Sequence, residues 1–213
     1  EVEAGEIGYK DEGAAFELWN WGYNGFGQLG QNNRTYYSSP IQIPGTTWSQ
    51  NCTAANNPAS RPHVFAVKTD GTLWVWGYSN YGGLGMNEPS NKSYSSPVQI
   101  PGTNWSTTRG TLIGQPYGGG AAIKTDGTLW IWGINRYGTL GLNDRISRSS
   151  PTQIPGTSWK QVTSGQQEEY QGLKTDGTLW SWGLANLGLN QPGNNLKSSP
   201  NQIPGTTWAS IYS

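Results

Sequence analysis

Few residues of this sequence are suited to catalysis or metal binding, and those few stand apart from the partners they would need. His63 is the only histidine and Cys52 the only cysteine, so the sequence indicates neither a catalytic triad nor a zinc site. We interpret Cys52 as a small buried side chain. The adjacent carboxylates of Glu168 and Glu169 would point to opposite faces in a strand and would be solvated in a loop. The sequence therefore predicts no catalytic residue, no metal, no cofactor and no enzyme activity.

A lysine and an aspartate recur in one short motif, which raises the question of acid–base chemistry. Lys-Thr-Asp-Gly occurs at 68–71, 124–127 and 174–177, each time between β-favouring residues. Asp-Gly in that setting is typical of a type I′ β-hairpin, because glycine adopts the positive φ of this turn at low cost. We therefore interpret the aspartate as a turn residue and the lysine as a solvated side chain.

These motifs belong to a unit that the chain repeats four times. Each copy carries Leu-Trp-x-Trp-Gly or a close variant, then a Gly-x-Leu-Gly element that is shortened in the fourth copy. Ser-Pro-x-Gln-Ile-Pro-Gly-Thr-x-Trp follows at 39–48, 96–105, 150–159 and 199–208. The second tryptophan of each pair stands at 21, 76, 132 and 182, so the period is 55, 56 and 50 residues. Periods of this length are typical of solenoids and propellers.

The segment after each Asp-Gly turn is predicted to be a strand that is covered on both faces. Leu73 and Val75 alternate with Trp74 and Trp76, so both faces are apolar, as in sheets that stack around an axis. Ser-Pro-x-Gln-Ile-Pro is predicted to be an edge strand, because proline removes hydrogen-bond donors. We predict an all-β chain, a single β-propeller domain of four repeat blades of about 50–56 residues each, with repeats at approximately 1–48, 49–105, 106–159 and 160–213.

The sequence leaves the closure of the propeller open. The first copy lacks an upstream strand with a tryptophan, and the chain ends with a spare one, from Trp208 to Tyr212. Either this C-terminal strand closes the four blades into a ring, or the blades are part of a larger propeller. Because the chain begins with Glu1 rather than Met, we expect residue 1 not to be the translation start.

The 12 tryptophans all fall on repeat positions, either in the Trp-x-Trp pairs or after Pro-Gly-Thr-x. A tryptophan-rich surface would favour sugar stacking. A residue that stands at the same place in every blade is better explained by the packing of the blade. We therefore interpret the tryptophans as core residues.

The order of these motifs resembles the regulator of chromosome condensation (alpha-tubulin suppressor-like) repeat family. Asp-Gly-Thr-Leu-Trp-x-Trp-Gly, Asn-x-x-Gly-x-Leu-Gly and Ser-Pro-x-x-Ile carry the resemblance, which covers nearly all of residues 18–213. It implies a propeller with one four-stranded blade per repeat, although the founding members have seven blades and no motif for the founder's nucleotide exchange is found here. The motif Gln-Ile-Pro-Gly-Thr-x-Trp is also similar to motifs in repeat proteins of tailed phages from aquatic environments. This resemblance implies a virion protein.

Charge and composition exclude several other classes of protein. The chain has 13 Lys and Arg, 13 Asp and Glu, and a formal net charge of zero. The basic residues are scattered, so the basic stripe of a nucleic-acid binder is missing, and so is a polybasic membrane anchor. No apolar run approaches transmembrane length, and we expect no insertion into a membrane.

The segments that differ between the copies are the candidates for binding. Four unlike loops separate Leu-Gly from Ser-Pro, at 31–37, 86–94, 142–148 and 189–197. Equivalent loops of a repeat array share one face, which is commonly the binding face. The loop residues suited to contact a partner are Arg34, Tyr36, Tyr37, Glu88, Lys92, Tyr94, Asp144, Arg145, Arg148 and Lys197. A second variable set, at 50–63, 107–120 and 161–170, precedes the hairpins, and we expect it on the opposite face.

These features favour a non-catalytic structural or interaction propeller. We expect it on a virion or an extracellular surface, with its variable loops on a protein partner that is another subunit or a second copy of itself. The alternative is a glycan-binding propeller for host attachment, which would need a similar polar-aromatic pocket in every blade. An enzyme or exchange factor ranks third, because no motif supports it.

Overall fold

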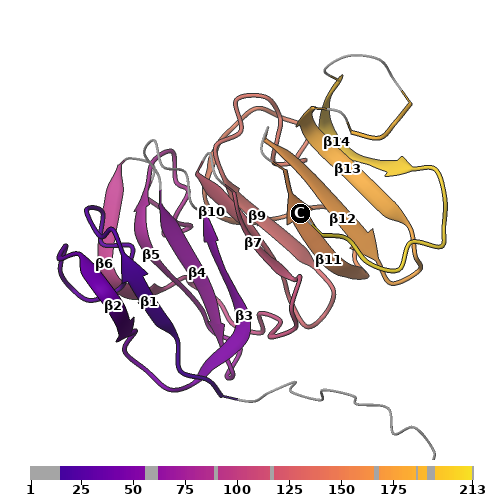
Figure 1. Cartoon of the computed structure of the whole chain (residues 1–213). Helices are drawn as coiled ribbons and strands as arrows, with labels where there is room; N and C mark the ends of the chain where they lie inside the picture. Colours follow the sequence, from indigo (N-terminus) through magenta and orange to yellow (C-terminus); the bar gives the residue numbers. More distant parts are fainter. Residues whose placement is uncertain are drawn as a thin grey trace, which may run out of the picture.

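The computed structural model describes residues 15–55, 62–88, 91–115, 118–165, 168–185, 187–190 and 195–212, and this part of the chain is all-β. Its fourteen strands form four antiparallel sheets, which follow one another along an arc from the indigo end to the yellow end in Figure 1. Because the described part holds no helix, the all-β prediction is confirmed. We call each sheet a blade.

Strands pair in sequence order within every four-stranded blade. The bounds are β1 (Trp19–Gly22) and β2 (Tyr37–Gln42) in the first blade; β3 (Trp48–Ala55), β4 (His63–Lys68), β5 (Leu73–Ser79) and β6 (Lys92–Gln99) in the second; β7 (Leu112–Gln115), β8 (Gly119–Ile123), β9 (Leu129–Gly133) and β10 (Arg148–Gln153) in the third; and β11 (Trp159–Ser164), β12 (Glu169–Lys174), β13 (Leu179–Ala185) and β14 (Asn195–Ile203) in the fourth. The strands with Ser-Ser-Pro are the outer edges, as predicted.

The Trp-x-Trp strands β5, β9 and β13 lie between two neighbours and are covered on both faces. Leu73, Val75 and Trp76 are fully buried, and Trp132 and Trp182 repeat the burial of Trp76. The prediction is therefore confirmed in three blades. It is wrong in the first blade, where Trp19 is 49% and Trp21 60% exposed, because that blade stands at the end of the arc and only two of its strands are described.

The Asp-Gly turns are not of type I′. Gly71 alone has a positive φ (+77°) among the turn residues, and its N–H donates to the Lys68 carbonyl at 2.9 Å while the Lys68 N–H donates to the Thr72 carbonyl. The turn is thus a three-residue loop whose last residue is left-handed. Asp70 accepts from the Thr72 N–H (2.9 Å) and hydroxyl (2.6 Å), which confirms its turn role and favours this longer loop. Asp126 and Asp176 do the same.

The motif lysine is not a solvated side chain. Lys68 Nζ lies 5.0 Å from the ring centre of Trp48 and 4.1 Å from that of Trp74. Lys124 and Lys174 have the same position in their blades. Because the electron-rich ring faces attract the ammonium group, the lysine joins the inner strand to the Trp-x-Trp strand of its own blade.

Three tryptophans form the same cluster in each complete blade. Trp48 begins the inner strand β3, and its ring centre lies 6.3 Å from Trp74 and 5.7 Å from Trp76. Trp159 begins β11 in the same way, and Trp105 precedes β7 and forms an isolated bridge with Lys124. Both are buried like Trp48 and contact the Trp-x-Trp pair of their own blade. The interpretation of the tryptophans as packing residues is confirmed for these nine. Trp208, at the equivalent position after the fourth blade, is 42% exposed.

The structure does not show the ring closure that the sequence left open. The first and fourth blades lie at opposite ends of the arc (Figure 1). The described C-terminal segment instead runs beside β11, where the Ile211 N–H donates to Gln161 Oε1 at 3.1 Å. The spare strand therefore stays on the fourth blade.

The turn aspartates predict acid sensitivity of the fold. Hydrogen bonds from the Thr72 side chain and backbone lower the pKa of Asp70, and Thr128 and Thr178 lower the pKa of Asp126 and Asp176 in the same way. A carboxyl with a depressed native pKa contributes stability above its unfolded pKa and loses it as the pH falls through the native value. We expect the urea midpoint to drop between about pH 5 and pH 3. The triple Asp→Asn variant should show a smaller drop, and an equal drop would contradict the assignment.

Removal of a tryptophan from a blade junction should be costly. Trp132 is fully buried, so Trp132→Ala should lower the free energy of unfolding by about 3–5 kcal/mol. Denaturant titration measures the loss, with Ile146→Ala as the control, because Ile146 is 65% exposed in the same blade and should change stability by less than about 0.5 kcal/mol. Equal effects would show that Trp132 is not a core residue in solution.

Candidate interaction face

Both sets of variable loops lie at the same end of the blades. In an antiparallel order such as β3-β4-β5-β6, the β3–β4 and β5–β6 connections leave one end of the sheet, and the Asp-Gly hairpins leave the other. The contacts agree, since the Tyr78 N–H at the end of β5 donates to the Pro62 carbonyl, and Ile134 and Leu184 do the same with Gly118 and Glu168. The expectation of opposite faces is wrong. We call the two ends the variable end and the constant end.

The ten candidate residues all belong to loops or strand starts at the variable end. Their exposure divides them into two groups. Exposed to solvent are Arg34, Tyr36, Lys92 and Arg145. Partly buried are Tyr37, Glu88, Tyr94, Asp144, Arg148 and Lys197.

Most of the partly buried candidates hold their own loops in place. Glu88 accepts a hydrogen bond from the Tyr94 hydroxyl at 2.6 Å and pairs with Lys92 at 3.4 Å. Desolvation, together with this carboxylate, raises the pKa of Tyr94 to about 12. In the third blade, Arg148 pairs with Asp144 and donates to the Ile146 carbonyl at 2.6 Å. Arg34, Tyr36 and Arg145 therefore remain as the side chains best placed to meet a partner.

An aromatic cluster at the variable end was not foreseen from the sequence. Tyr36 lies 4.9 Å from Tyr23, Tyr23 lies 6.1 Å from Phe26, and Phe26 stacks on Tyr78 at 5.3 Å between ring centres. Tyr23 and Tyr36 are 54% and 62% exposed. Tyr23 and Tyr78 both follow Trp-x-Trp-Gly in the sequence, a shared position that could have been noticed. The cluster bridges the first and second blades and joins Tyr36 to them.

The burial of two potentially reactive residues, Glu168 and Cys52, differs from the interpretation of the sequence. Glu168 is 4% exposed and accepts from Arg136 of the preceding blade at 3.0 Å, so it is a buried partner in a junction and not a solvated carboxylate. Cys52 is exposed on β3 and not buried. His63 is buried at the start of β4, with Nε2 3.2 Å from the Gly119 carbonyl. Among the described residues, no group of three His, Cys, Asp or Glu could hold a metal ion.

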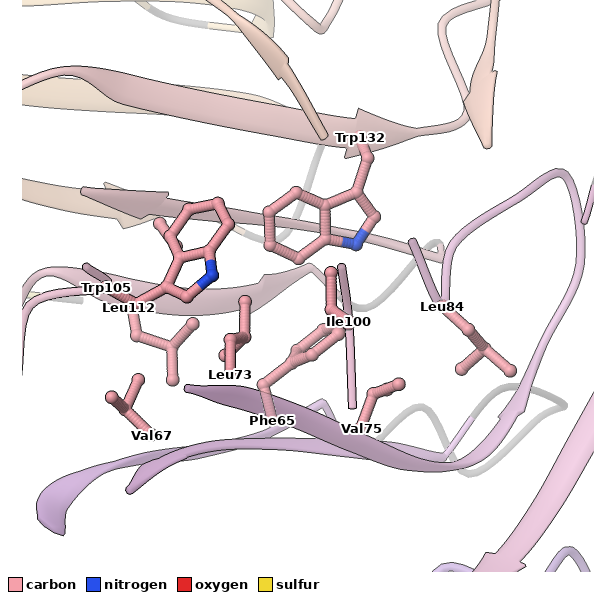
Figure 2. Close-up of a cluster of buried hydrophobic side chains, with 10 residues drawn as sticks. Phe65, Val67, Leu73, Val75, Leu84, Ile100, Trp105, Leu112 and Trp132 are labelled. Carbon is pink, nitrogen blue, oxygen red and sulfur yellow. The ribbon is translucent and has the colours of Figure 1, made fainter. Parts of the chain in front are cut away.

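The first three variable loops are each fixed at their base by the next blade. Gly30, Gly85 and Gly141 of the Gly-x-Leu-Gly elements lie directly against Trp76, Trp132 and Trp182 of the following blade. Trp76 Nε1 donates to the Gln28 carbonyl (2.9 Å) and Trp132 Nε1 to the Gly83 carbonyl (3.1 Å). Figure 2 shows Trp132 reaching from the third blade toward Phe65 and Ile100 of the second. We call this contact of loop and tryptophan the latch.

A backbone hydrogen bond completes each latch. The N–H groups of Asn32, Asn87 and Asn143 donate to the carbonyls of Ser95, Ser149 and Ser198, each at 2.6 Å. All three serines lie in the outer strand of the next blade. The latch therefore holds each loop across a blade boundary, so neighbouring loops form one continuous surface.

Stacked antiparallel blades, tied by a repeated latch, define the protein as a β-propeller of repeat blades. The family model described as "Regulator of chromosome condensation (RCC1) repeat" matches residues 17–55, 70–107 and 126–167. These segments make up more than half of the chain, which belongs to this family. The resemblance noted in the sequence is thus confirmed.

Several known proteins share this sequence pattern or this fold. The chain is 26% identical over 157 residues to the ultraviolet-B receptor UVR8 of Arabidopsis thaliana, which is 74% of this chain and 34% of UVR8. It is 26% identical over 151 residues to the mitochondrial RCC1 domain-containing protein RUG3 of the same plant, with 69% of this chain and 33% of RUG3 covered. The chain thus spans about a third of the length of these relatives.

Two solved structures show the same fold. Human WBSCR16 superposes with a TM-score of 0.67 at 22% identity, over 87% of this chain and 47% of that one. Prp20p of Saccharomyces cerevisiae gives 0.68 at 18% identity, over 89% and 47%. In the described part of this chain, no helix is long and apolar enough to cross a membrane.

The latch predicts which glycines are indispensable. A Cβ on Gly141 would stand 2.8 Å from Trp182 Cδ1, whereas a Cβ on Gly71 would meet nothing closer than 3.4 Å, and both residues have similar positive φ (+69° and +77°). Gly141→Ala should therefore destabilise the fold by about 1–3 kcal/mol more than Gly71→Ala. Denaturant titration of both variants measures the difference. Equal losses would mean that backbone strain alone explains the glycine.

Proposed function

We propose that this chain is a non-catalytic binding module that holds a protein partner on its variable end. The observation that carries the proposal is the exposed group of Tyr23, Arg34, Tyr36 and Arg145 on loops with rigid bases. Tyrosine and arginine are enriched where protein interfaces have their highest energies. Rigid loop bases favour binding, because little conformational entropy is lost when the partner docks.

The relatives are consistent with a protein partner. The Prp20p structure was described together with the binding properties of Prp20p to Gsp1p and histones, and a second structure holds Kap60 bound to yeast RCC1. Fold similarity below 25% identity does not transfer these partners. It supports only the class of ligand, which is a protein.

The finer assignments stay predictions. The prediction of a virion or extracellular location depends on the resemblance of the repeat motifs to those of phage proteins. The relatives named above come from a plant, human and yeast and add no support to it. The glycan alternative would need a similar aromatic pocket in each blade. The aromatic cluster found here joins the first two blades, and the four loops differ in sequence.

Replacement of the outward side chains should weaken binding without unfolding the chain. The variant carries Arg34→Ser, Tyr36→Ser and Arg145→Ser. It should keep the wild-type melting temperature and bind its partner at least about tenfold more weakly. The reason is that interface Tyr and Arg residues commonly contribute more than about 1 kcal/mol each to binding. The immobilised wild type and the immobilised variant are used to capture partners from an extract of cells that produce the protein. Mass spectrometry then compares the amount of partner that each one recovers.

The matched control changes the constant end. Thr46→Ala, Thr103→Ala and Thr157→Ala replace exposed residues there, and this variant should recover the same partner as the wild type. A partner that is lost with the constant-end variant, or kept by both variants, would contradict the proposal. Glycan-array binding that disappears in the variable-end variant would favour the glycan alternative instead.

A further inference from the structure

The tryptophan cluster that forms three times inside the molecule has a fourth set of residues, and that set is divided between the two ends of the arc. Each complete cluster joins the tryptophan that starts or precedes an inner strand to the Trp-x-Trp pair of the same blade. In the fourth set, Trp19 and Trp21 stand on the first blade and Trp208 stands beyond the fourth. Their exposures are 49%, 60% and 42%, against 1–3% for Trp48, Trp105 and Trp159.

The C-terminal segment already has the position of an inner strand for a following blade. The Trp208 N–H donates to the Gly177 carbonyl at 3.1 Å, just as Trp105 donates to Gly71 and Trp159 to Gly127, each at 3.0 Å. Lys160 Nζ contacts the Ala209 carbonyl at 3.2 Å. Residues 208–212 are thus seated beside β11, and the strands that would pair with them are not on this end.

The residues equivalent to a latch contact are likewise separated, with Asn190 on the fourth blade and Ser38 on the first. Asn190 has the left-handed backbone (φ +54°) of Asn32, Asn87 and Asn143, whose N–H groups bind Ser95, Ser149 and Ser198 of the next blade. The equivalent serine of the first blade is Ser38, which is exposed on β2. Within the described residues, Gly188 to Asn190 of the fourth blade thus have no following blade to contact, and the first blade presents Ser38 without a preceding one.

The first blade also borders a groove. The groove has a volume of about 660 Å³ and is lined by Trp21 and Phe26 of the first blade and by Ala54, His63 and Val64 of the second. At the next junction, the inner strands β3 and β4 of the second blade pack on β7 of the third. The described part of the first blade has only β1 and β2, without such inner strands.

We propose that a second copy of this chain docks head to tail, so that the C-terminal end of each copy completes the first blade of the other. Trp208 of one copy then packs on Trp19 and Trp21 of its partner, and the Asn190 loop latches onto Ser38. Because the two surfaces differ, the contact is heterologous, and a two-fold axis closes it into a ring with two identical junctions.

This junction involves Asn190 of the fourth variable loop and Phe26 of the aromatic cluster, so it borders the variable end. The binding variant changes Arg34, Tyr36 and Arg145 and leaves Trp21 and Trp208 unchanged, so failure of this proposal can be distinguished from failure of the proposed function.

The mass of the purified chain in solution tests the proposal. Size-exclusion chromatography with light scattering should give twice the mass of one chain, with dissociation on dilution. A single-chain mass at every concentration would overturn the proposal, and the ends would then belong to other repeats. A mass of three or more chains would overturn the two-copy ring.

Two end variants test the head-to-tail geometry. Trp21→Asp alters only the first-blade surface and Trp208→Asp only the C-terminal surface, so each variant alone should be monomeric. Mixed together, they retain one intact junction and should form a 1:1 pair. Ile146→Asp, on the third blade, is the matched control and should remain dimeric. An equimolar mixture that stays monomeric, or single variants that still dimerise, would exclude this junction.

A further variant keeps the test decisive if the aspartates disturb folding. The Asn32, Asn87 and Asn143 N–H groups lie 2.6 Å from the carbonyls of Ser95, Ser149 and Ser198, so each of these serines is covered closely by the loop of the preceding blade. Ser38→Trp would fill the equivalent place on the first blade while changing an exposed residue. It should preserve the circular dichroism spectrum and the melting temperature and reduce the dimer at least tenfold. Unchanged dimerisation would overturn the latch assignment.

Discussion

The packing of a tryptophan from one blade beneath the Gly-x-Leu-Gly loop of the preceding blade is the contact on which the rest of this structure depends. Gly85 and Gly141 allow the backbone to lie against the indole rings of Trp132 and Trp182. The same loops place Asn87 and Asn143 within hydrogen-bond distance of the next outer strand. Core packing, blade order and the position of the variable loops thus follow from one repeated junction.

This junction explains how a chain with only 33% hydrophobic residues builds a core. Tryptophan has the largest apolar surface of any side chain, so one per junction replaces several aliphatic residues. The core clusters accordingly cross blade boundaries, as Trp132 does with Phe65 and Leu84. A blade therefore depends on its neighbours for stability, as in other repeat arrays. Trp19 and Trp21, whose blade has no preceding blade among the described residues, are accordingly exposed.

The sequence predicted whatever the repeat itself determines. The period, the doubly covered strand of Trp74 and Trp76 and the outer strand with Ser-Pro follow from local patterns that recur in every copy. The turn type was wrong, because the Asp70 carboxylate binds Thr72 and selects a longer loop. The contacts of Lys68 and Glu168 do not follow from local patterns, since their partners Trp48 and Arg136 are distant in sequence. The face of the second variable set was misplaced, although the antiparallel strand order alone determines it.

The loops at the variable end combine a contact with the neighbouring blade and residues that differ between the copies. In the first three loops, the first residues hold the next blade in place, and the residues that follow differ between copies, as Asn33, Glu88 and Asp144 do. A ligand that spans two such loops would grip both sides of a blade boundary at once. Occupancy would then be coupled to rigidity, because separation of the blades would require release of the ligand first. The ligand-bound protein would then unfold at a higher temperature and be cleaved more slowly by proteases than the unbound protein, without any change in its shape.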